Sequence, residues 1–327
     1  MTTIRDVAKL AGVSPSTASR VLHDSDMISE ATKKKVRQAM KELDYSPNYL
    51  AQNLANKSNN MIGIVLPVRH DHPALSNNPF FMQIIQGIVT VCNKRNYMVS
   101  LATGQTDDEL IKNLTTLSKQ GLINKFIFVY SKENDPVFDY VQKRTEAETI
   151  VVGSPYAKVT KRARYVNNDN VQAGKDLTNY LLKRGYQEIA YVYSNLSEVV
   201  QEDRYMGYKD ALKAKAEHLL CLESNDQTEL VANFLETNPE VDAFVACDDM
   251  TAIFLQQILT RLELAANAYG LAGFNNSLIG QLGHPSLTSV EIHPYELGME
   301  AAKLLTQTTT KNYLLVEHTI IKRDSTK

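Results

Sequence analysis

The chain has 327 residues, is 43% hydrophobic and has a net charge of −2, so its length allows two or three domains with full cores. No apolar run approaches a membrane span and no signal peptide opens the chain, which predicts a cytoplasmic protein. Three cysteines without Cys-x-x-Cys spacing indicate neither a disulfide framework nor a zinc site.

Residues 3–23 predict two short helices joined by a tight turn. In the first helix, hydrophobic residues recur at i, i+3, i+4 and i+7: Ile4, Val7, Ala8 and Ala11. Gly12 ends this helix, Ser14 can cap the next one and Pro15 can open it. The outer face of the second helix is short and polar and carries one guanidinium: Pro15, Ser16, Ser19 and Arg20. This is the outline of a DNA-reading helix-turn-helix, although a plain helical hairpin would show the same pattern.

A third helix begins after Ser29, and its first half is basic. Its apolar positions again keep helical spacing: Val36, Ala39, Met40 and Leu43. Residues 1–60 have a net charge of +3, whereas the remainder has −5. Positive charge therefore gathers beside the helix-turn-helix, where phosphates would lie, although a charged helix face is often only a solvated face.

These residues resemble the heads of the lactose-repressor/galactose-repressor family of bacterial transcription regulators, which read roughly I-x-D-V-A-x-x-A-G-V-S-x-x-T-V-S-R-V-L. The departure within this stretch is Ala18, which replaces the usual Val. The resemblance implies a DNA-binding domain over residues 1–46. The contacts that it implies there are Ser14, Pro15, Ser16, Thr17, Ser19, Arg20 and Ser29. Arg20 is the strongest candidate, because a guanidinium fits the two major-groove acceptors of guanine.

Residues 47–60 resemble the hinge helix and linker of that family, although an ordinary interdomain linker would have a similar composition. A helix of roughly two turns is marginal in water, so it would form only when something holds it. The resemblance implies that two hinges pair over the minor groove and that Leu54 wedges between base pairs. Asn48 and Ala51 are further DNA contacts implied here.

From Met61 onward, short apolar runs alternate with amphipathic helical patterns. The expected strands are 61–68, 97–103, 125–130 and 149–153, followed by 188–194, 219–223, 242–247 and 268–274. Continuous apolar character favours parallel strands that are covered on both faces. We therefore expect two doubly wound α/β subdomains, with a ligand cleft at the carboxyl ends of their strands.

The resemblance extends over the whole chain and implies a periplasmic-binding-protein-like core of two subdomains. The first would comprise residues 61–164 plus about 290–310, and the second residues 165–289 plus about 311–327. The chain would cross to the first subdomain near Ser289 and return near Leu314.

The resemblance also places effector contacts on the loops after the strands. The residues that it implies are Phe80, Phe81, Asn168, Asp169, Arg204, Asp248 and Asn275. Arg204 is the leading candidate, because a planar fork can hold two vicinal hydroxyls. Simpler roles stay open: core packing for the two phenylalanines, a helix cap for Asp169 and a salt bridge for Arg204. Cys247 and Asn275 depart from the common Asn and Asp of the family.

The expected function is a homodimeric repressor of a sugar-utilisation operon that binds a near-palindromic operator and is released by a small effector. The pocket motifs are most similar to those of maltose-operon regulators of Gram-positive bacteria, so maltose or a maltooligosaccharide is the expected effector. The alternatives are a global catabolite regulator with a phosphorylated carrier protein as corepressor, or a response to another sugar or a purine. An extracellular sugar-binding protein would share the cleft but would not need the head.

Enzymatic activity is not expected, because the phosphate-binding, dinucleotide-binding, nucleophile-elbow and zinc-protease motifs are absent. His70-Asp71-His72 lacks a further spaced ligand and is interpreted as a polar loop rather than a metal site. No cofactor, metal or membrane partner is expected.

Overall fold

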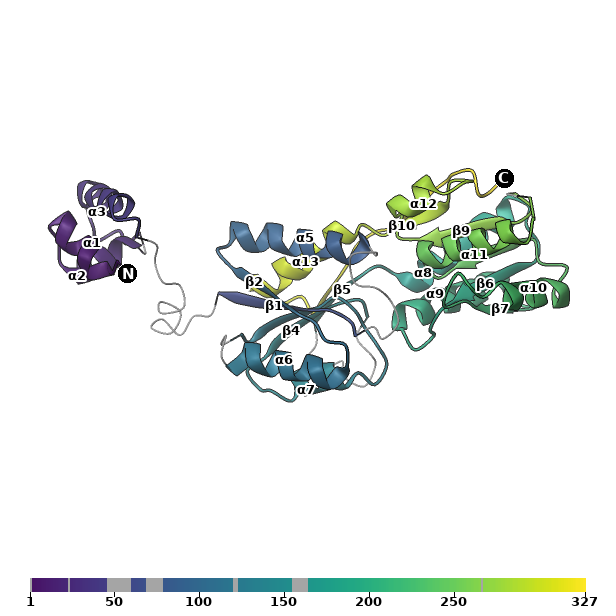
Figure 1. The fold of residues 1–327 in the computed structure, drawn as a ribbon, viewed down its shortest axis with the longest axis horizontal. Coiled ribbons are helices and arrows are strands. Elements are labelled where there is room, and N and C mark those ends of the chain that lie inside the picture. The colour runs from purple at the N-terminus through teal and green to yellow at the C-terminus, as the bar shows by residue number, and fades with distance from the viewer. Residues whose placement is uncertain are drawn as a thin grey trace. The chain divides into compact units, whose positions relative to one another are not determined.

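A computed structural model describes residues 2–22, 24–45, 60–68, 79–119, 123–154, 164–265 and 267–327. The chain divides into two units, Met1–Asn60 and Met61–Lys327, each of which has its own core (Figure 1). The hinge residues Asn48, Ala51 and Leu54 lie outside the described residues, and so does the segment His70–His72.

The first unit is the expected helical head. Its described helices are α1 (Ile4–Ala11), α2 (Pro15–Leu22) and α3 (Glu30–Glu42). Thr3 and Asp6 form a reciprocal capping box at the start of α1, and Gly12 ends that helix with a left-handed φ of 66°. The three helices share a small buried core of Val7, Ala8, Ala18, Val21, Val36 and Ala39. Ala18 therefore packs inward, as its place on the inner face predicts.

The first lobe of the second unit is a parallel sheet with helices on both faces. Its strands, in spatial order, are β11 (Tyr313–Leu315), β5 (Arg164–Asn167), β4 (Glu148–Val152), β3 (Lys125–Phe128), β1 (Met61–Val65) and β2 (Met98–Ala102). Helices α5 (Pro79–Lys94) and α13 (Pro294–Thr306) cover one face. Helices α6 (Asp107–Lys119) and α7 (Pro136–Gln142) cover the other (Figure 1). This is the doubly wound arrangement that continuous apolar strands predict.

The second lobe repeats this plan. Its sheet order is β12 (Thr319–Ile321), β10 (Thr288–Glu291), β9 (Gly270–Phe274), β8 (Ala243–Ala246), β6 (Ile189–Tyr193) and β7 (His218–Cys221). Only β12, at the edge, runs antiparallel to its neighbour among these strands. The helices of this lobe are α8 (Asn170–Lys183), α9 (Val199–Leu212), α10 (Thr228–Thr237), α11 (Asp249–Arg261) and α12 (Leu278–Leu282).

Each lobe contains one pair of helices that approach closely through glycines. A Cβ added to Gly87 of α5 would lie 2.1 Å from a backbone oxygen of α13, and one added to Gly298 of α13 would lie 2.1 Å from a backbone oxygen of α5. In the second lobe, Cβ atoms at Gly174 and Gly207 would lie 2.2 and 2.0 Å from the backbone oxygens of Arg204 and Val171. The backbone that carries Arg204 is therefore fixed against α8.

Strand pairing corrects the expected boundaries of the subdomains. Strand β5 pairs with β4 in the first sheet, so the first lobe extends to Asn167 rather than ending at residue 164. Strand β10 belongs to the second sheet, and the chain crosses to the first lobe after it. Strand β11 still pairs with β5, so residues 311–315 belong to the first lobe and the return to the second lobe comes after Leu315, close to the expected return near Leu314. Short strands are assigned by their hydrogen-bonded neighbours, which sequence periodicity does not reveal.

Candidate effector and DNA-binding sites

A cleft of about 830 Å³ lies between the two lobes of the second unit. Its walls are the segments that follow the strands of both sheets, with Tyr130 after β3 and Ser154 after β4 in the first lobe. In the second lobe, Ser194 follows β6, Cys247 follows β8 and Asn275 follows β9. The cleft thus lies at the carboxyl ends of the strands, where ligands bind in open α/β sheets.

Arg204 is the most distinctive residue of this cleft. It is only 3% exposed, and its guanidinium carbon lies 4.2 Å from the centre of the Phe274 ring. Nε donates to Oδ1 of Asn170 at 3.0 Å, and Nη1 donates to the carbonyl oxygen of Cys247 at 2.6 Å. Burial lowers the pKa of Arg204. A buried cation therefore faces the cleft.

The partners of Arg204 leave part of its hydrogen-bonding capacity unused. Within the described residues these partners are neutral, so the alternative of a salt bridge to Asp203 or Asp169 is not observed. A guanidinium has five N–H donors, and two of them are engaged. The other three have no partner among the described residues, and Arg204 lines the cleft.

Among the described residues, the lining of the cleft has more acidic than basic side chains. Its lining includes two cations, Lys132 and Arg204, and five carboxylates: Asp107, Asp135, Glu198, Glu223 and Asp248. Asp135 is 8% exposed, and this burial raises its pKa. A ligand with a net negative charge would meet repulsion from this set, whereas a neutral polar ligand would find both donors and acceptors.

Phe80 and Phe81 both line the cleft at the start of α5. Their rings meet edge to face with centroids 5.2 Å apart. Phe81 is buried in the core of the first lobe, whereas Phe80 is half-buried and packs against the cores of both lobes. The two rings therefore take different roles, one packing inward and the other facing the junction of the lobes.

The other predicted effector residues divide into three groups. Asp248 and Asn275 line the cleft, with Asp248 also capping α11 through a 2.8 Å bond from the amide of Thr251. Asn168 lines the cleft too, but its side-chain amide donates to the backbone carbonyls of Ile292 and Val316, where the chain passes between the lobes. Asp169 is exposed, is not part of the lining and caps α8 through the amide of Gln172. For Asp169, the structure therefore shows the simpler role of a helix cap.

Several lining residues were not predicted from the sequence: Tyr130, Ser131, Asp135, Ser154, Asn170 and Gln201. Three of them follow β3 closely, so the rule that ligands lie beyond strand ends could have found them. Ser154 follows β4 and Asn170 follows β5, so the same rule applies to them, whereas Gln201 lies within α9 and has no such signal. Gln201 accepts from the amides of Ser194 and Asn195 at 3.0 and 3.1 Å, which orders the loop after β6.

The head presents the expected polar face. Six of its predicted DNA contacts are exposed, namely Ser14, Pro15, Ser16, Ser19, Arg20 and Ser29. Thr17 is half-buried, and its backbone amide donates to the side chain of Ser14 at 3.1 Å. Ser29 caps α3 by accepting from the amide of Thr32. The outer face of α2 is therefore free of the core and open to a ligand.

Pairing within the head reduces the charge that is available for phosphates. Lys33 is buried and lies 3.2 Å from Asp24 and 3.0 Å from Glu30, and Arg37 lies 2.7 Å from Asp24. Lys34 and Lys35 remain exposed. The basic run of α3 is thus partly an internal brace between α3 and the turn before it.

A chain that carries both a helix-turn-helix head and a two-lobed ligand cleft has the architecture of a ligand-responsive transcription regulator. Residues 3–48 match the model of bacterial regulatory proteins of the lacI family. Residues 59–327 match the periplasmic binding proteins and sugar binding domain of the LacI family. The chain therefore belongs to the LacI family and is a transcription regulator rather than an enzyme.

Similar proteins cover nearly all of this chain. The HTH-type transcriptional regulator MalR of Streptococcus pneumoniae is 32% identical over 95% of this chain and 93% of its own length. A structure of a complex of the transcriptional regulator CelR with cellobiose is 26% identical, with a TM-score of 0.73, and covers 99% of this chain and 100% of its own. The lac repressor dimer bound to operator shares the fold, with a TM-score of 0.81 at 20% identity over 99% and 98% of the two chains. No helix among the described residues is long and apolar enough to cross a membrane.

Proposed function

We propose that the chain represses a sugar-utilisation operon as a homodimer and is released from its operator when maltose or a short maltooligosaccharide binds in the cleft. The observation that carries this proposal is the guanidinium of Arg204, which is buried at the cleft with three N–H donors unused by the described residues. A planar fork of this kind suits two adjacent hydroxyls.

The character of the cleft favours a neutral polyhydroxylated ligand. The acidic excess among its described lining residues opposes phosphosugars, and the carboxylates and amides among them offer acceptors to hydroxyl groups. Phe80 lines the cleft with a half-buried aromatic side chain, which adds apolar surface to the lining. A volume of about 830 Å³ exceeds what one monosaccharide needs, which supports a ligand of two or three rings. The CelR relative is a complex with cellobiose, a disaccharide.

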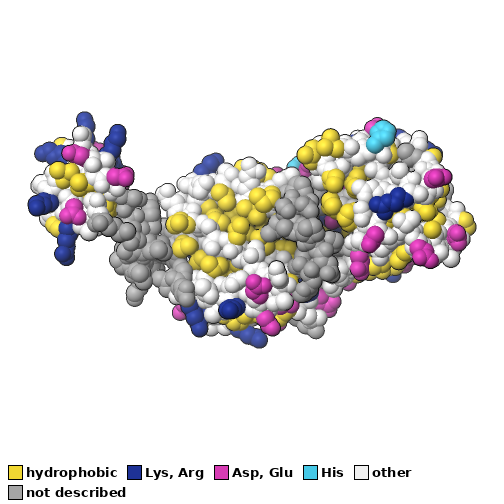
Figure 2. All heavy atoms as spheres, in the orientation of Figure 1, with side chains coloured by type: hydrophobic (Ala, Val, Ile, Leu, Met, Phe, Trp, Pro, Cys, Tyr) yellow, Lys and Arg dark blue, Asp and Glu magenta, His cyan; other side chains and the backbone are white. Residues whose placement is uncertain are grey.

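The exposed apolar side chains of the second unit support a homodimer. On α5 and β2 they are Met82, Met98 and Leu101, and on α12 they are Leu278, Ile279 and Leu282. Figure 2 shows hydrophobic side chains gathered over both regions on one face of this unit. Clustered apolar exposure of this kind marks an interaction surface. A symmetric dimer would present two heads to a near-palindromic operator.

Ligand-driven closure of the cleft is the proposed route to release. The lobes already touch at the rim, where the amide of Glu133 donates to the carbonyl of Ser197 at 3.2 Å and Lys132 forms a backbone bridge with Glu198. A sugar held by both lobes would favour the closed arrangement and shift the dimer toward the form that binds DNA weakly. The shift cannot exceed the difference between the sugar's affinities for the two forms.

Calorimetric titration with maltose, maltotriose, trehalose, sucrose, ribose and purines tests the effector. We expect maltose or maltotriose to bind the wild type, to weaken its complex with operator DNA and to bind Arg204→Ala at least tenfold more weakly, which is about 1.4 kcal/mol. Binding of another sugar or a purine in place of maltose would show that the effector was wrongly assigned, but it would still support a ligand-responsive repressor. If operator binding requires a phosphorylated carrier protein, the chain is a global catabolite regulator and not the repressor of a single sugar operon.

A further inference from the structure

We propose that Asn170 positions Arg204, and that a chain of hydrogen bonds from Arg204 through Asn170 and Asn167 to Ser154 couples the ligand site of the second lobe to the wall of the first. The functional part of this proposal rests on the effector role of the cleft. The series of hydrogen bonds itself is a property of the fold and can be tested without any effector.

The four residues form an unbroken series across the junction of the lobes. Nε of Arg204 donates to Oδ1 of Asn170 at 3.0 Å. Nδ2 of Asn170 donates to Oδ1 of Asn167 at 3.0 Å, and Nδ2 of Asn167 donates to Oγ of Ser154 at 2.8 Å. Arg204 lies on α9 and Asn170 opens α8 in the second lobe, whereas Asn167 ends β5 and Ser154 follows β4 in the first.

Arg204 determines which residue donates and which accepts in every hydrogen bond of the series. An arginine Nε–H can only donate, so Asn170 must present its oxygen to it. The amide nitrogen of Asn170 then faces Asn167, which must in turn present its oxygen. Asn167 is left with its nitrogen toward Ser154, whose hydroxyl can accept. The amide orientations are therefore set by chemistry, and a change at Arg204 acts on each link in order.

Burial makes this series sensitive to any break. Asn167, Asn170 and Arg204 are 6%, 4% and 3% exposed, so their polar groups depend mainly on protein partners for hydrogen bonds. The far end is also anchored, because the hydroxyl of Ser131 donates to the backbone carbonyl of Ser154 and the amide of Gly153 donates to Val166 at 2.9 Å. A ligand whose hydroxyls displace the guanidinium therefore changes the hydrogen bonds that connect Arg204 to the first lobe.

The first test observes Arg204 without any effector. The Nε–H signal of Arg204 in a ¹⁵N–¹H spectrum of the full-length protein is assigned by its loss in Arg204→Lys. We expect Ser154→Ala, Asn167→Ala and Asn170→Ala to shift this signal by increasing amounts. Ser224→Ala is the matched control, since Ser224 also lines the cleft but lies outside the series. A signal that stays at its wild-type position in both Ser154→Ala and Asn167→Ala would overturn the proposal.

The second test separates positioning from coupling, with maltose as the probe. Asn170→Ala is expected to weaken maltose binding about tenfold, because Arg204 loses its Nε acceptor. Asn167→Ala is expected to weaken maltose binding less than Asn170→Ala does and to lower, by about fivefold, the factor by which maltose weakens operator binding. Asn167→Asp keeps an acceptor for Asn170, and the hydroxyl of Ser154 can turn to donate to it, so this variant should restore the factor.

The two tests distinguish failure of this proposal from failure of the proposed effector. If maltose does not bind the wild type, the effector assignment is wrong, while the Arg204 signal still supports or refutes the series. If maltose binds and releases DNA from the wild type but Asn167→Ala keeps the full release factor, the coupling is refuted although the effector assignment holds.

Discussion

The side-chain nitrogen of Asn168 lies 2.9 Å from the carbonyl oxygen of Val316 and donates a hydrogen bond to it. The same nitrogen donates to the carbonyl of Ile292 at 3.1 Å. Asn168 follows β5, Ile292 follows β10 and Val316 follows β11, so these residues mark the three passages of the described chain between the lobes. One buried amide thus joins all three passages.

Substitution of Asn168 is expected to destabilise the core. Asn168→Asp places a carboxylate against two carbonyl oxygens, and because the site is only 2% exposed we expect a loss of about 3 kcal/mol or more in the free energy of unfolding. Asn168→Ala leaves the carbonyls unpaired and should cost about 1–3 kcal/mol. Urea unfolding measures both changes. Asp169→Asn is the matched control at the adjacent position, since Asp and Asn both cap a helix well. If Asn168→Asp loses no more stability than this control, the Asn168 amide does not stabilise the junction of the lobes.

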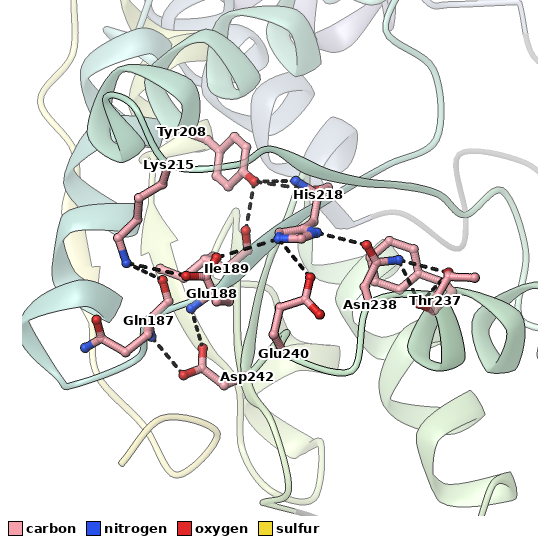
Figure 3. A network of polar contacts seen from close by, with 11 residues as sticks. Gln187, Glu188, Ile189, Tyr208, Lys215, His218, Thr237, Asn238, Glu240 and Asp242 are labelled. Carbon is pink, nitrogen blue, oxygen red and sulfur yellow. Dashed lines mark hydrogen bonds and ion pairs between the residues drawn. The ribbon is translucent and has the colours of Figure 1, made fainter.

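Tyr208 connects the interior of the second lobe to a polar network at the amino end of its sheet (Figure 3). Its hydroxyl donates to the carbonyl of Ile189 at 2.8 Å and accepts from the amide of His218 at 3.2 Å. Tyr208→Phe leaves both buried groups without this partner, so we expect a loss of about 1–3 kcal/mol in the free energy of unfolding.

The matched control for Tyr208 lies on the same helix. The hydroxyl of Tyr205 donates to the exposed carboxylate of Glu217, which water can solvate when the bond is lost. Tyr205→Phe should therefore change stability by less than about 1 kcal/mol. Equal losses in the two variants, measured by thermal and urea unfolding, would contradict the burial argument.

The sequence predicted those parts of the fold that depend on local patterns. Helices α1 and α2 have the expected apolar stripes and turn, and the continuous apolar strands form the two expected sheets. Strands β11 and β12 have three residues each, and their sheet membership depends on which neighbour they pair with. That choice is made by tertiary geometry, so the boundaries of the subdomains could not be placed from periodicity.

The same distinction applies to the cleft. Arg204, Asp248 and Asn275, for which the family motifs imply effector contacts, line it. Asp169 and Asn170 are adjacent in sequence, yet the first faces solvent as a cap and the second is buried against Arg204. The direction of each side chain at a helix start depends on backbone angles that the residue letters do not reveal.

Asp249 is expected to make the stability of the core depend on pH. Its carboxylate is buried and accepts from the amide and hydroxyl of Ser277 at 2.6 and 2.8 Å and from the hydroxyl of Ser289 at 2.6 Å. Burial raises its pKa to about 6, partly offset by these hydrogen bonds. In the unfolded chain the pKa is near 3.9, so between about pH 4 and 6 the folded form holds a proton that the unfolded form has lost. Stability contributed by this group is therefore greatest below about pH 4 and falls as pH rises toward 6.

Asp249→Asn removes this titration. Its amide oxygen can accept from Ser277, and its nitrogen can donate to the hydroxyl of Ser289, which is able to accept. Relative to the wild type, the variant should therefore gain of the order of 2 kcal/mol in unfolding free energy between about pH 4.5 and 7. Asp203, whose pKa burial also raises to about 6, is present in both proteins and cancels from the comparison. A difference that stays constant across this range, by urea unfolding, would rule out Asp249 as the source.

The guanidinium of Arg20 is expected to carry most of the base discrimination of the head, because it is exposed on the outer face of α2 among short hydroxyl side chains. Arg20→Ala should reduce the ratio of affinities for a selected operator and a scrambled duplex by about 1–3 kcal/mol, the usual value of a bidentate contact with guanine. Arg5→Ala is the matched control, since it removes the same charge from an exposed position on α1. A phosphate contact at Arg5 would weaken both duplexes alike and leave the ratio unchanged. Fluorescence anisotropy at one fixed salt concentration measures the ratio, and equal ratios in the wild type and Arg20→Ala would exclude Arg20 as a base reader.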